Sequence, residues 1–126
     1  MSTVENLIYP LPPTDEGWHV VGRENELFAE GACHGAQIEG VRIGVFLVEG
    51  RVYALNDICT HGNALLSEGD LEGHEIECPL HAGAFDVRTG EALCSPLTRD
   101  ARWHEARLED GWVSVRLNRE HTANGQ

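Results

Sequence analysis

The chain has 126 residues, a length typical of one domain, and its 21 acidic and 9 basic residues give a formal net charge of −12. That charge disfavours binding to nucleic acids or to anionic membrane surfaces, because both need clustered positive charge. No apolar run approaches the roughly 18 residues that a membrane-spanning helix needs. The first basic residue is Arg23, so the N-terminus does not resemble a secretory signal. We therefore expect a cytoplasmic protein with no nucleic-acid or membrane partner.

Short strands separated by glycines and acidic residues dominate the first half of the chain. Residues 1–16 contain three prolines and little periodicity, so we expect an extended N-terminal arm. One strand is predicted over residues 18–21. A second is predicted over residues 41–48, where apolar residues alternate with others. The Glu-Gly turn that follows predicts a hairpin with a third strand over residues 51–55.

The second half contains a loop-rich region and then a C-terminal hairpin. The strand pattern fails between residue 56 and about residue 97. Residues 103–108 and 112–117 predict two strands joined by an Asp-Gly turn. A polar tail is expected over residues 118–126, and no window has sustained helical periodicity. These elements predict an all-β fold for residues 17–117, an antiparallel β-sandwich or barrel, with a loop-rich lobe over about residues 57–97.

The loop-rich region contains two cysteines and two histidines at the spacing of metal ligands. Cys59 and His61 are followed, after sixteen residues, by Cys78 and His81. Two Cys and two His can bind zinc, but a single residue between Cys59 and His61 makes it awkward for both to reach one ion. The spacing is comfortable if the two side chains bind different irons of one cluster.

The chain has four cysteines, at positions 33, 59, 78 and 94. Two disulfides are an alternative interpretation, with three possible connectivities. A chain without an export signal is expected to keep its thiols reduced, so the metal interpretation is favoured.

Residues 59–62 (Cys-Thr-His-Gly) and 78–81 (Cys-Pro-Leu-His) resemble the signature of Rieske 2Fe-2S proteins. The resemblance extends over about residues 18–117. It implies a Rieske fold and one 2Fe-2S cluster, with Cys59 and Cys78 binding one iron and His61 and His81 binding the other. It also implies that the histidine rings face the redox partner, and it implies no catalytic residue.

Differences within the Rieske family indicate which kind of member this chain resembles. Respiratory-chain members carry an extra cysteine in each loop, and those positions here are Ala64 and Leu80. Those members also have serine and tyrosine hydroxyls just after the second histidine. Here residues 82–85 are Ala-Gly-Ala-Phe, so less negative charge is stabilised on reduction. We expect a potential nearer to about −150 mV than to about +300 mV.

These features resemble the Rieske ferredoxins of bacterial aromatic-ring-hydroxylating dioxygenases. The resemblance implies a single-electron carrier between a flavoprotein NAD(P)H reductase and a terminal oxygenase, and a chain that is not an enzyme on its own. One alternative is the Rieske small subunit of another oxidoreductase, such as a nitrite-reductase-like enzyme. The other is a zinc-stabilised binding module without a redox role.

The remaining conspicuous residues are given mainly structural interpretations. The Cys33-His34 pair is expected in a strand rather than at a second metal. Cys94 is expected to be a free thiol, and Pro96 is the candidate for the loop that covers the cluster in the family. His74 is expected in a solvated turn. The three tryptophans, Trp18, Trp103 and Trp112, are expected to fill the β core, with one of them on a docking face as the alternative.

Acidic residues are concentrated around the predicted ligands. Residues 52–87 contain no arginine and seven acids. The acids either solvate exposed loops or form a negative rim that steers the protein toward basic partners. They are Asp57, Glu68, Asp70, Glu72, Glu75, Glu77 and Asp86.

Overall fold

The computed structural model describes residues 16–60, 62–80, 83–93 and 99–118. Its elements are β1 (Trp18–Arg23), α2 (Glu24–Leu27), β2 (Cys33–Ile38), β3 (Val41–Val48), β4 (Arg51–Asn56), η1 (Leu66–Glu68), β5 (Asp70–Glu72), β6 (Glu75–Glu77), β7 (Ala84–Asp86), β8 (Trp103–Glu109) and β9 (Trp112–Arg116). The predicted arm and tail lie almost entirely outside the described ranges, as do Cys94 and Pro96.

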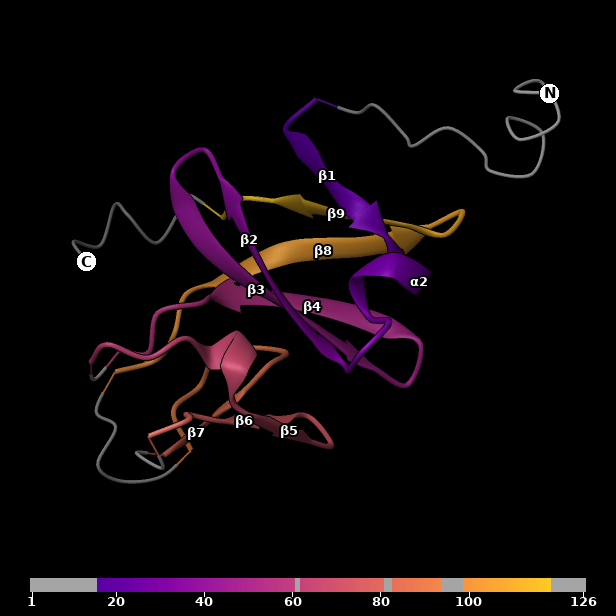
Figure 1. Cartoon of the computed structure of the whole chain (residues 1–126). Helices are drawn as coiled ribbons and strands as arrows, with labels where there is room; N and C mark the ends of the chain where they lie inside the picture. The colour runs from indigo at the N-terminus through magenta and orange to yellow at the C-terminus, as the bar shows by residue number, and fades with distance from the viewer. Residues whose placement is uncertain (1–15, 61, 81–82, 94–98, 119–126) are drawn as a thin grey trace, which may run out of the picture.

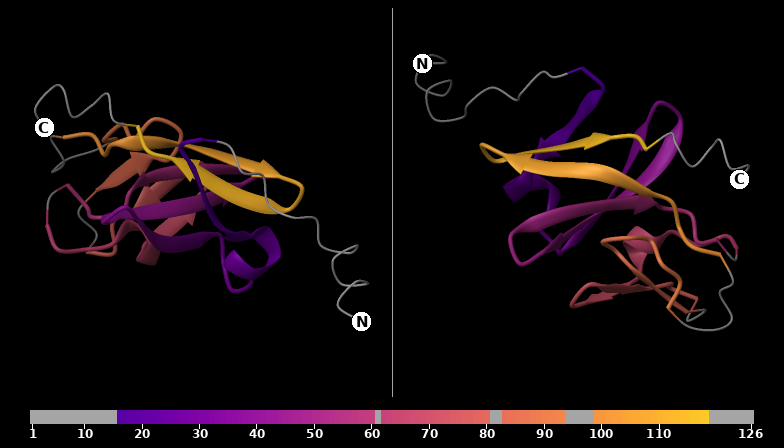
Figure 2. Two further views of the ribbon diagram at one scale, coloured as in Figure 1. Left: turned by 90° about the horizontal axis from the view of Figure 1, so that it is seen from above. Right: turned by 180° about the vertical axis from the view of Figure 1, so that it is seen from behind.

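The strands form two antiparallel sheets. Six strands make a large sheet in the order β1-β9-β8-β4-β3-β2, and three short strands make a small sheet in the order β5-β6-β7. The small sheet and its loops form a lobe at one end of the large sheet, which is seen from the front and from behind (Figures 1 and 2). The expectation of an all-β fold with a separate lobe is confirmed. No helix in the described ranges is long and apolar enough to cross a membrane.

The strongest predicted strands occur where the sequence places them. β3 spans residues 41–48 as expected, while β1 and β4 extend beyond their predicted ends. Three hairpin turns share an acidic residue followed by glycine, both with positive φ, which is the geometry that two-residue hairpin loops favour. These turns are Glu39-Gly40, Glu49-Gly50 and Asp110-Gly111.

Two elements differ from the expectation. Residues 24–27 form a single turn of helix, too short to produce a helical period. Residues 70–86 include the three strands of the small sheet, although the sequence predicts no strand in this loop-rich region. Each of these strands has only three residues, which is too short for an alternation of apolar and polar residues to be recognised in the sequence.

One hydrophobic core lies inside the large sheet, which curls into a near-barrel. All six strands contribute side chains to it, and Leu27 of α2 packs against it. Its buried members come from β2, β3, β4 and β9: Ile38, Ile43, Val45, Val52, Ala54, Val113 and Val115. Neither Cys59 nor Cys78 belongs to this core.

A second core joins the lobe to the outside of the large sheet. Phe46 and Val48 of β3 pack there with Leu66, Ile76 and Phe85 from the lobe. β3 is therefore buried on both faces, although alternation predicted only the face of Ile43 and Val45. Cys59 and Cys78 also belong to this second core.

The prediction that the tryptophans fill the β core is wrong. Trp18 lies beneath two guanidinium groups, with Arg107 at 4.3 Å and Arg116 at 5.0 Å from its ring centroid. The Arg23 guanidinium lies 5.9 Å from the Trp112 ring, and Trp103 is 36% exposed. Cation–π stacking holds such rings at the surface, and the cores are filled mainly by aliphatic residues and two phenylalanines.

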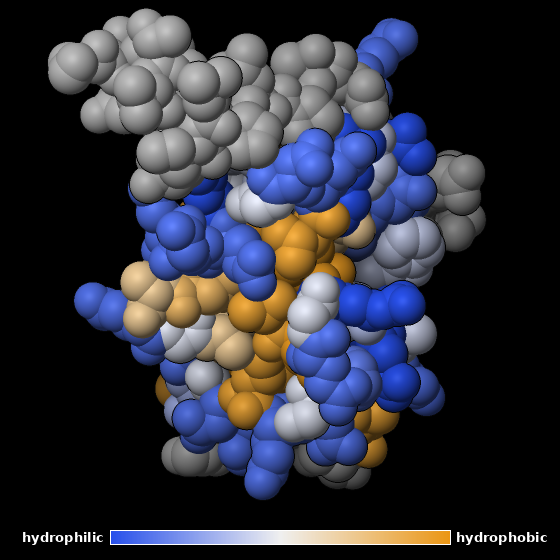
Figure 3. All heavy atoms as spheres, turned by 90° about the vertical axis from the view of Figure 1, so that its right-hand side faces the viewer, coloured by the Kyte–Doolittle hydropathy of each residue, from blue (hydrophilic) through white to orange (hydrophobic). Residues whose placement is uncertain are grey.

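Hydrophobic surface remains on the side of the molecule that carries α2. There, a band of hydrophobic residues runs between hydrophilic ones (Figure 3). A groove of about 620 Å³ beside α2 is lined by residues of α2, β2, η1 and β5. Cys33 and His34 lie in this groove and in β2, so their placement in a strand is confirmed.

Candidate metal centre

The first predicted ligand loop leaves β4 after Asn56 and returns at η1. Within it, the Cys59 N–H donates to the Ala64 carbonyl at 2.8 Å, and the Gly62 N–H donates to the Cys59 carbonyl at 3.2 Å. These bonds fold the loop tightly around Cys59, which is only 3% exposed. His61 lies outside the described residues.

The second predicted ligand loop connects β6 to β7. Cys78 follows β6 directly and is fully buried, and its N–H donates to the Gly83 carbonyl at 3.0 Å. Gly83 has a φ of 121°, a conformation that favours glycine over any residue with a Cβ. The bond therefore closes this loop as a tight turn. His81 lies outside the described residues.

The fold brings the two predicted cysteine ligands into one hydrophobic core. Cys59 and Cys78 come from separate loops, belong to the second core, and are free thiols, as is Cys33. None of these three cysteines forms a disulfide, so the interpretation with two disulfides is wrong. The described residues alone contain no group of three or more His, Cys, Asp or Glu side chains that could hold a metal ion. Two buried thiols on facing loops nevertheless suit a cluster that takes its other ligands from His61 and His81.

A buried carboxylate anchors the first ligand loop. Asp57 is fully buried and accepts hydrogen bonds from the Ser67 N–H and Ser67 Oγ, both at 2.7 Å. It also accepts one from Arg42 Nε of β3 at 3.1 Å. Asp57 was counted among the possible rim acids, but its burial excludes it from any surface rim.

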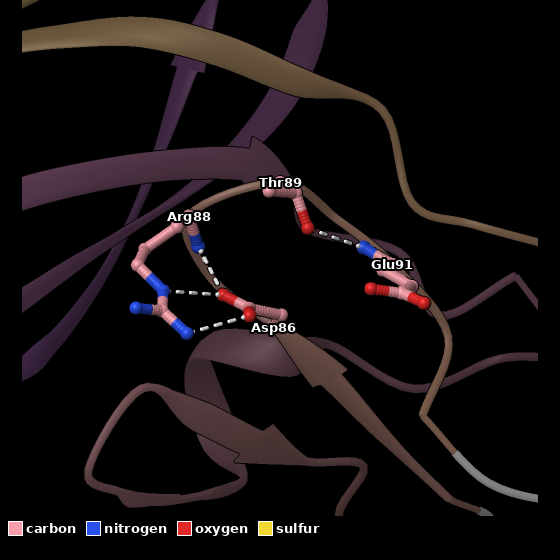
Figure 4. A network of polar contacts seen from close by, with 4 residues as sticks. All are labelled: Asp86, Arg88, Thr89 and Glu91. Carbon is pink, nitrogen blue, oxygen red and sulfur yellow. Dashed lines mark hydrogen bonds and ion pairs between the residues drawn. The ribbon is translucent and has the colours of Figure 1, made fainter.

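A second carboxylate organises the turn that follows β7. Asp86 Oδ1 accepts from the Arg88 N–H at 2.8 Å and from Arg88 Nε at 3.0 Å, and Asp86 Oδ2 accepts from Arg88 Nη2 at 2.9 Å (Figure 4). The hydrogen bond and charge of Arg88 lower the pKa of Asp86. Asp86 is thus neutralised locally and contributes little to a negative rim.

Four of the remaining acids are exposed on the lobe. We define the acidic rim by these residues: Glu68, Asp70, Glu72 and Glu75. Glu77 is only partly exposed. His74 occupies the turn between β5 and β6, as expected, but it is half-buried and packs edge-on against Tyr53 with ring centroids 5.8 Å apart.

A buried histidine that the sequence pattern does not single out joins β4 to the end of β9. The Asn118 N–H donates to His104 Nδ1 at 3.0 Å. His104 Nε2 therefore carries the proton and donates to Asn56 Oδ1 at 2.7 Å. Asn56 is the last residue of β4 before the first ligand loop, so His104 fixes the point from which that loop departs. An isolated histidine in an alternating strand gives no sequence signal for this role.

Two buried free cysteines on separate lobe loops of an all-β scaffold suit an iron–sulfur electron-transfer domain. The model of the Rieske 2Fe-2S domain matches residues 17–109. The chain belongs to the Rieske family, and its cofactor is a Rieske 2Fe-2S cluster. The resemblance of residues 59–62 and 78–81 to the Rieske signature is confirmed. The alternative of a zinc-stabilised binding module receives no support from this match.

Similar sequences are ferredoxin components of dioxygenase systems. The ferredoxin component of the naphthalene 1,2-dioxygenase/salicylate 5-hydroxylase systems of Ralstonia sp is 48% identical over 88 residues, covering 70% of this chain and 85% of that protein. The anthranilate 1,2-dioxygenase ferredoxin subunit of Burkholderia cepacia is 39% identical over 101 residues, covering 79% and 92%.

The similar solved structures include a complex of an oxygenase with its ferredoxin and a separate oxygenase. A chain in the complex of reduced oxygenase and oxidized ferredoxin in carbazole 1,9a-dioxygenase has a TM-score of 0.73 and 37% identity, over 81% of this chain and 94% of that one. Apo dicamba monooxygenase has a TM-score of 0.68 and 26% identity, over 80% of this chain but 33% of its own. Together with the ferredoxin relatives, this similarity identifies the protein as a Rieske ferredoxin, an electron-transfer component.

Proposed function

We propose that this protein carries single electrons from a flavoprotein NAD(P)H reductase to the terminal oxygenase of an aromatic-ring-hydroxylating dioxygenase in the cytoplasm. Cys59, His61, Cys78 and His81 are the proposed cluster ligands. The observation that carries the proposal is the convergence of two buried free cysteines, Cys59 and Cys78, in a fold shared with the ferredoxin components of such systems.

The ligand set suits a one-electron carrier. When bound, the cluster accepts and releases one electron. Two thiolates and two neutral imidazoles leave the oxidised site without net charge, which favours reduction relative to an all-cysteine site. Burial of Cys59 and Cys78 in the second core excludes water from the thiolate side.

The surface beside the proposed ligands supports docking of a partner protein. Ile58 and Leu80, the neighbours of Cys59 and His81 in sequence, are 55% and 56% exposed. Exposed apolar side chains beside a redox centre allow close approach of a partner and removal of water from the contact. The acidic rim lies on the same lobe and supplies charge that attracts basic partners.

Reconstitution tests the proposal. The purified protein should be red-brown and bleach on reduction, and it should restore substrate-dependent NAD(P)H oxidation to a mixture of reductase and oxygenase components that lacks a ferredoxin. A cluster that forms but transfers no electrons to any such oxygenase would contradict the assignment of the partner.

Substitution of single cysteines tests the ligands. Cys59→Ser and Cys78→Ser should abolish the visible spectrum, whereas Cys33→Ser and Cys94→Ser should retain it. Loss of the cluster in either of the latter variants would show that the ligand assignment is wrong.

A further inference from the structure

Asp57 is the one acidic residue that is fully buried among the described residues. It stands two residues before Cys59, so their Cα atoms are at most about 7 Å apart. A buried ion is costly unless it is paired and hydrogen-bonded. A carboxylate at this place therefore has a specific role or a specific set of partners.

Asp57 joins the two ends of the first ligand loop. At the start of the loop, its own N–H donates to the Arg42 carbonyl of β3 at 2.9 Å. At the end of the loop, its carbonyl accepts from the Leu66 N–H at 2.6 Å, and its carboxylate accepts from Ser67 N–H and Oγ. A single residue thus fixes both ends of the segment that contains Cys59 and His61.

Strand β3 provides the space for this carboxylate. A Cβ at Gly44 would lie 2.6 Å from Asp57 Oδ1 and 2.9 Å from the Phe46 ring, closer than real Cβ atoms approach. Glycine at this position lets the loop lie directly against the strand. The close approach brings Asp57 within reach of Arg42 on β3.

The charge of Asp57 is only partly compensated. Its side chain is 0% exposed, whereas the side chain of Arg42 is 37% exposed, so water screens the guanidinium more than the carboxylate. Cys33, which packs against the second core, responds to that charge. Burial raises the pKa of its thiol to about 11, and the charges of Asp57 and Asp70 add to the effect. The field of Asp57 therefore extends into the core that contains Cys59 and Cys78.

We propose that Asp57 is a positioning residue that fixes the first ligand loop and that its buried charge lowers the reduction potential of the cluster, with Arg42 as the opposing charge. The inference rests on the proposed function, because it takes Cys59 and His61 as ligands. An electron added near a buried negative charge is disfavoured, and an electron added near a positive charge is favoured.

Two substitutions of opposite charge test the proposal in the full-length holoprotein. Asp57→Asn should shift the reduction potential to a more positive value, and Arg42→Gln should shift it to a more negative value. A purely structural role would loosen the loop in both variants and would not give shifts of opposite sign. Potentials are measured by voltammetry at fixed pH, at low and at high salt. Because Asp57 is buried, its shift should persist at high salt.

Two further variants serve as controls. Ser67→Ala removes one hydrogen bond and keeps the charge, so it should lose the cluster severalfold faster in the presence of a chelator while its potential stays close to that of the wild type. Arg51→Gln removes the same charge as Arg42→Gln from an exposed position on the next strand. Its effect on the potential should be smaller and should disappear at high salt.

The outcomes separate this inference from the proposed function. If the wild type shows no 2Fe-2S spectrum with mixed ligation, the proposed function fails. If the spectra are intact but Asp57→Asn and Arg42→Gln leave the potential unchanged or shift it in the same direction, this inference alone fails. If Asp57→Asn does not fold, the comparison of Arg42→Gln with Arg51→Gln decides, and equal shifts would overturn the proposal.

Discussion

Thr60 and Arg99 hold each other through two reciprocal hydrogen bonds across 39 positions of sequence. Thr60 Oγ1 donates to the Arg99 carbonyl at 3.1 Å, and Arg99 Nη2 donates to the Thr60 carbonyl at 3.3 Å. Thr60 lies between Cys59 and His61, so the pair ties the first ligand loop to the segment that leads into β8. It also places a positive charge beside the stretch of residues 52–87, which contains seven acids and no arginine.

The Thr60–Arg99 pair should slow the loss of the cluster. Thr60→Val removes the hydroxyl donor, which at about 1 kcal/mol corresponds to about fivefold faster bleaching in the presence of a chelator. Absorbance at a visible band of the cluster follows the reaction. Thr89→Val is a matched control, because it removes another exposed hydrogen bond, from the Glu91 N–H, in the turn after β7. Equal bleaching of Thr60→Val and the wild type would exclude a role for the pair.

The acidic rim should accelerate association with the oxygenase. Glu72 and Glu75 face each other across the β5–β6 hairpin. Reversal of both to arginine should lower the second-order rate of electron transfer about tenfold at low salt and leave the maximal rate nearly unchanged. The effect should fade at about 0.15 M ionic strength, where screening limits such attraction to about 8 Å. Stopped-flow mixing of reduced protein with the oxygenase at two salt concentrations measures both rates.

A control for net charge comes from acids outside the lobe. Glu16→Arg together with Glu109→Arg changes the total charge equally, at exposed positions in the large-sheet region. This variant should retain most of the association rate. Equal slowing in both double variants would mean that total charge, rather than the rim, governs docking.

Alkaline pH should destabilise the wild type more than a Cys33→Ser variant. The pKa of the Cys33 thiol is raised from 9.0 to about 11, first by burial and then by the charges of Asp57 and Asp70. The stabilisation from the neutral thiol is fully present below pH 9 and is lost as the pH rises through about 11. Since Cys33 is only half-buried, we expect a loss of about 1–2 kcal/mol. Thermal unfolding midpoints from circular dichroism at pH 8 and pH 10.5 provide the comparison. Equal changes in the wild type and in Cys33→Ser would show that ionisation of Cys33 is not the cause of the alkaline destabilisation.

The reduction potential should lie in the lower part of the Rieske range, nearer to about −150 mV than to about +300 mV. The sequence Ala-Gly-Ala-Phe at residues 82–85 follows His81 in the region where respiratory-chain members have hydroxyl side chains, and Phe85 is fully buried in the second core. The potential should vary with pH only under alkaline conditions, because oxidised iron lowers the pKa of a bound imidazole. Voltammetry from neutral to strongly alkaline pH tests both points. A steep slope already below neutral pH would contradict the second.

The sequence predicts those parts of the structure that depend on local pattern. The alternation and Glu-Gly turn around residues 41–55 define a hairpin without reference to the rest of the chain, and the ligand spacing around Cys59 and Cys78 depends only on chemistry. The role of Asp57 could not be predicted in this way. It reads as one more acid in an acidic stretch, because its partner Arg42 is 15 residues away and on another strand. The burial of the second face of β3 likewise depends on strands of three residues that have no visible period.

The hydrophobic interior is divided into two cores, and Cys59 and Cys78 belong to only one of them. The core inside the near-barrel contains neither Cys59 nor Cys78, whereas the core beneath the lobe contains both. β3 and β4 each contribute buried side chains to both cores: Phe46 and Leu55 on the side of the lobe, Val45 and Ala54 inside the near-barrel. These two strands therefore couple the packing of the scaffold to the packing around the two cysteines.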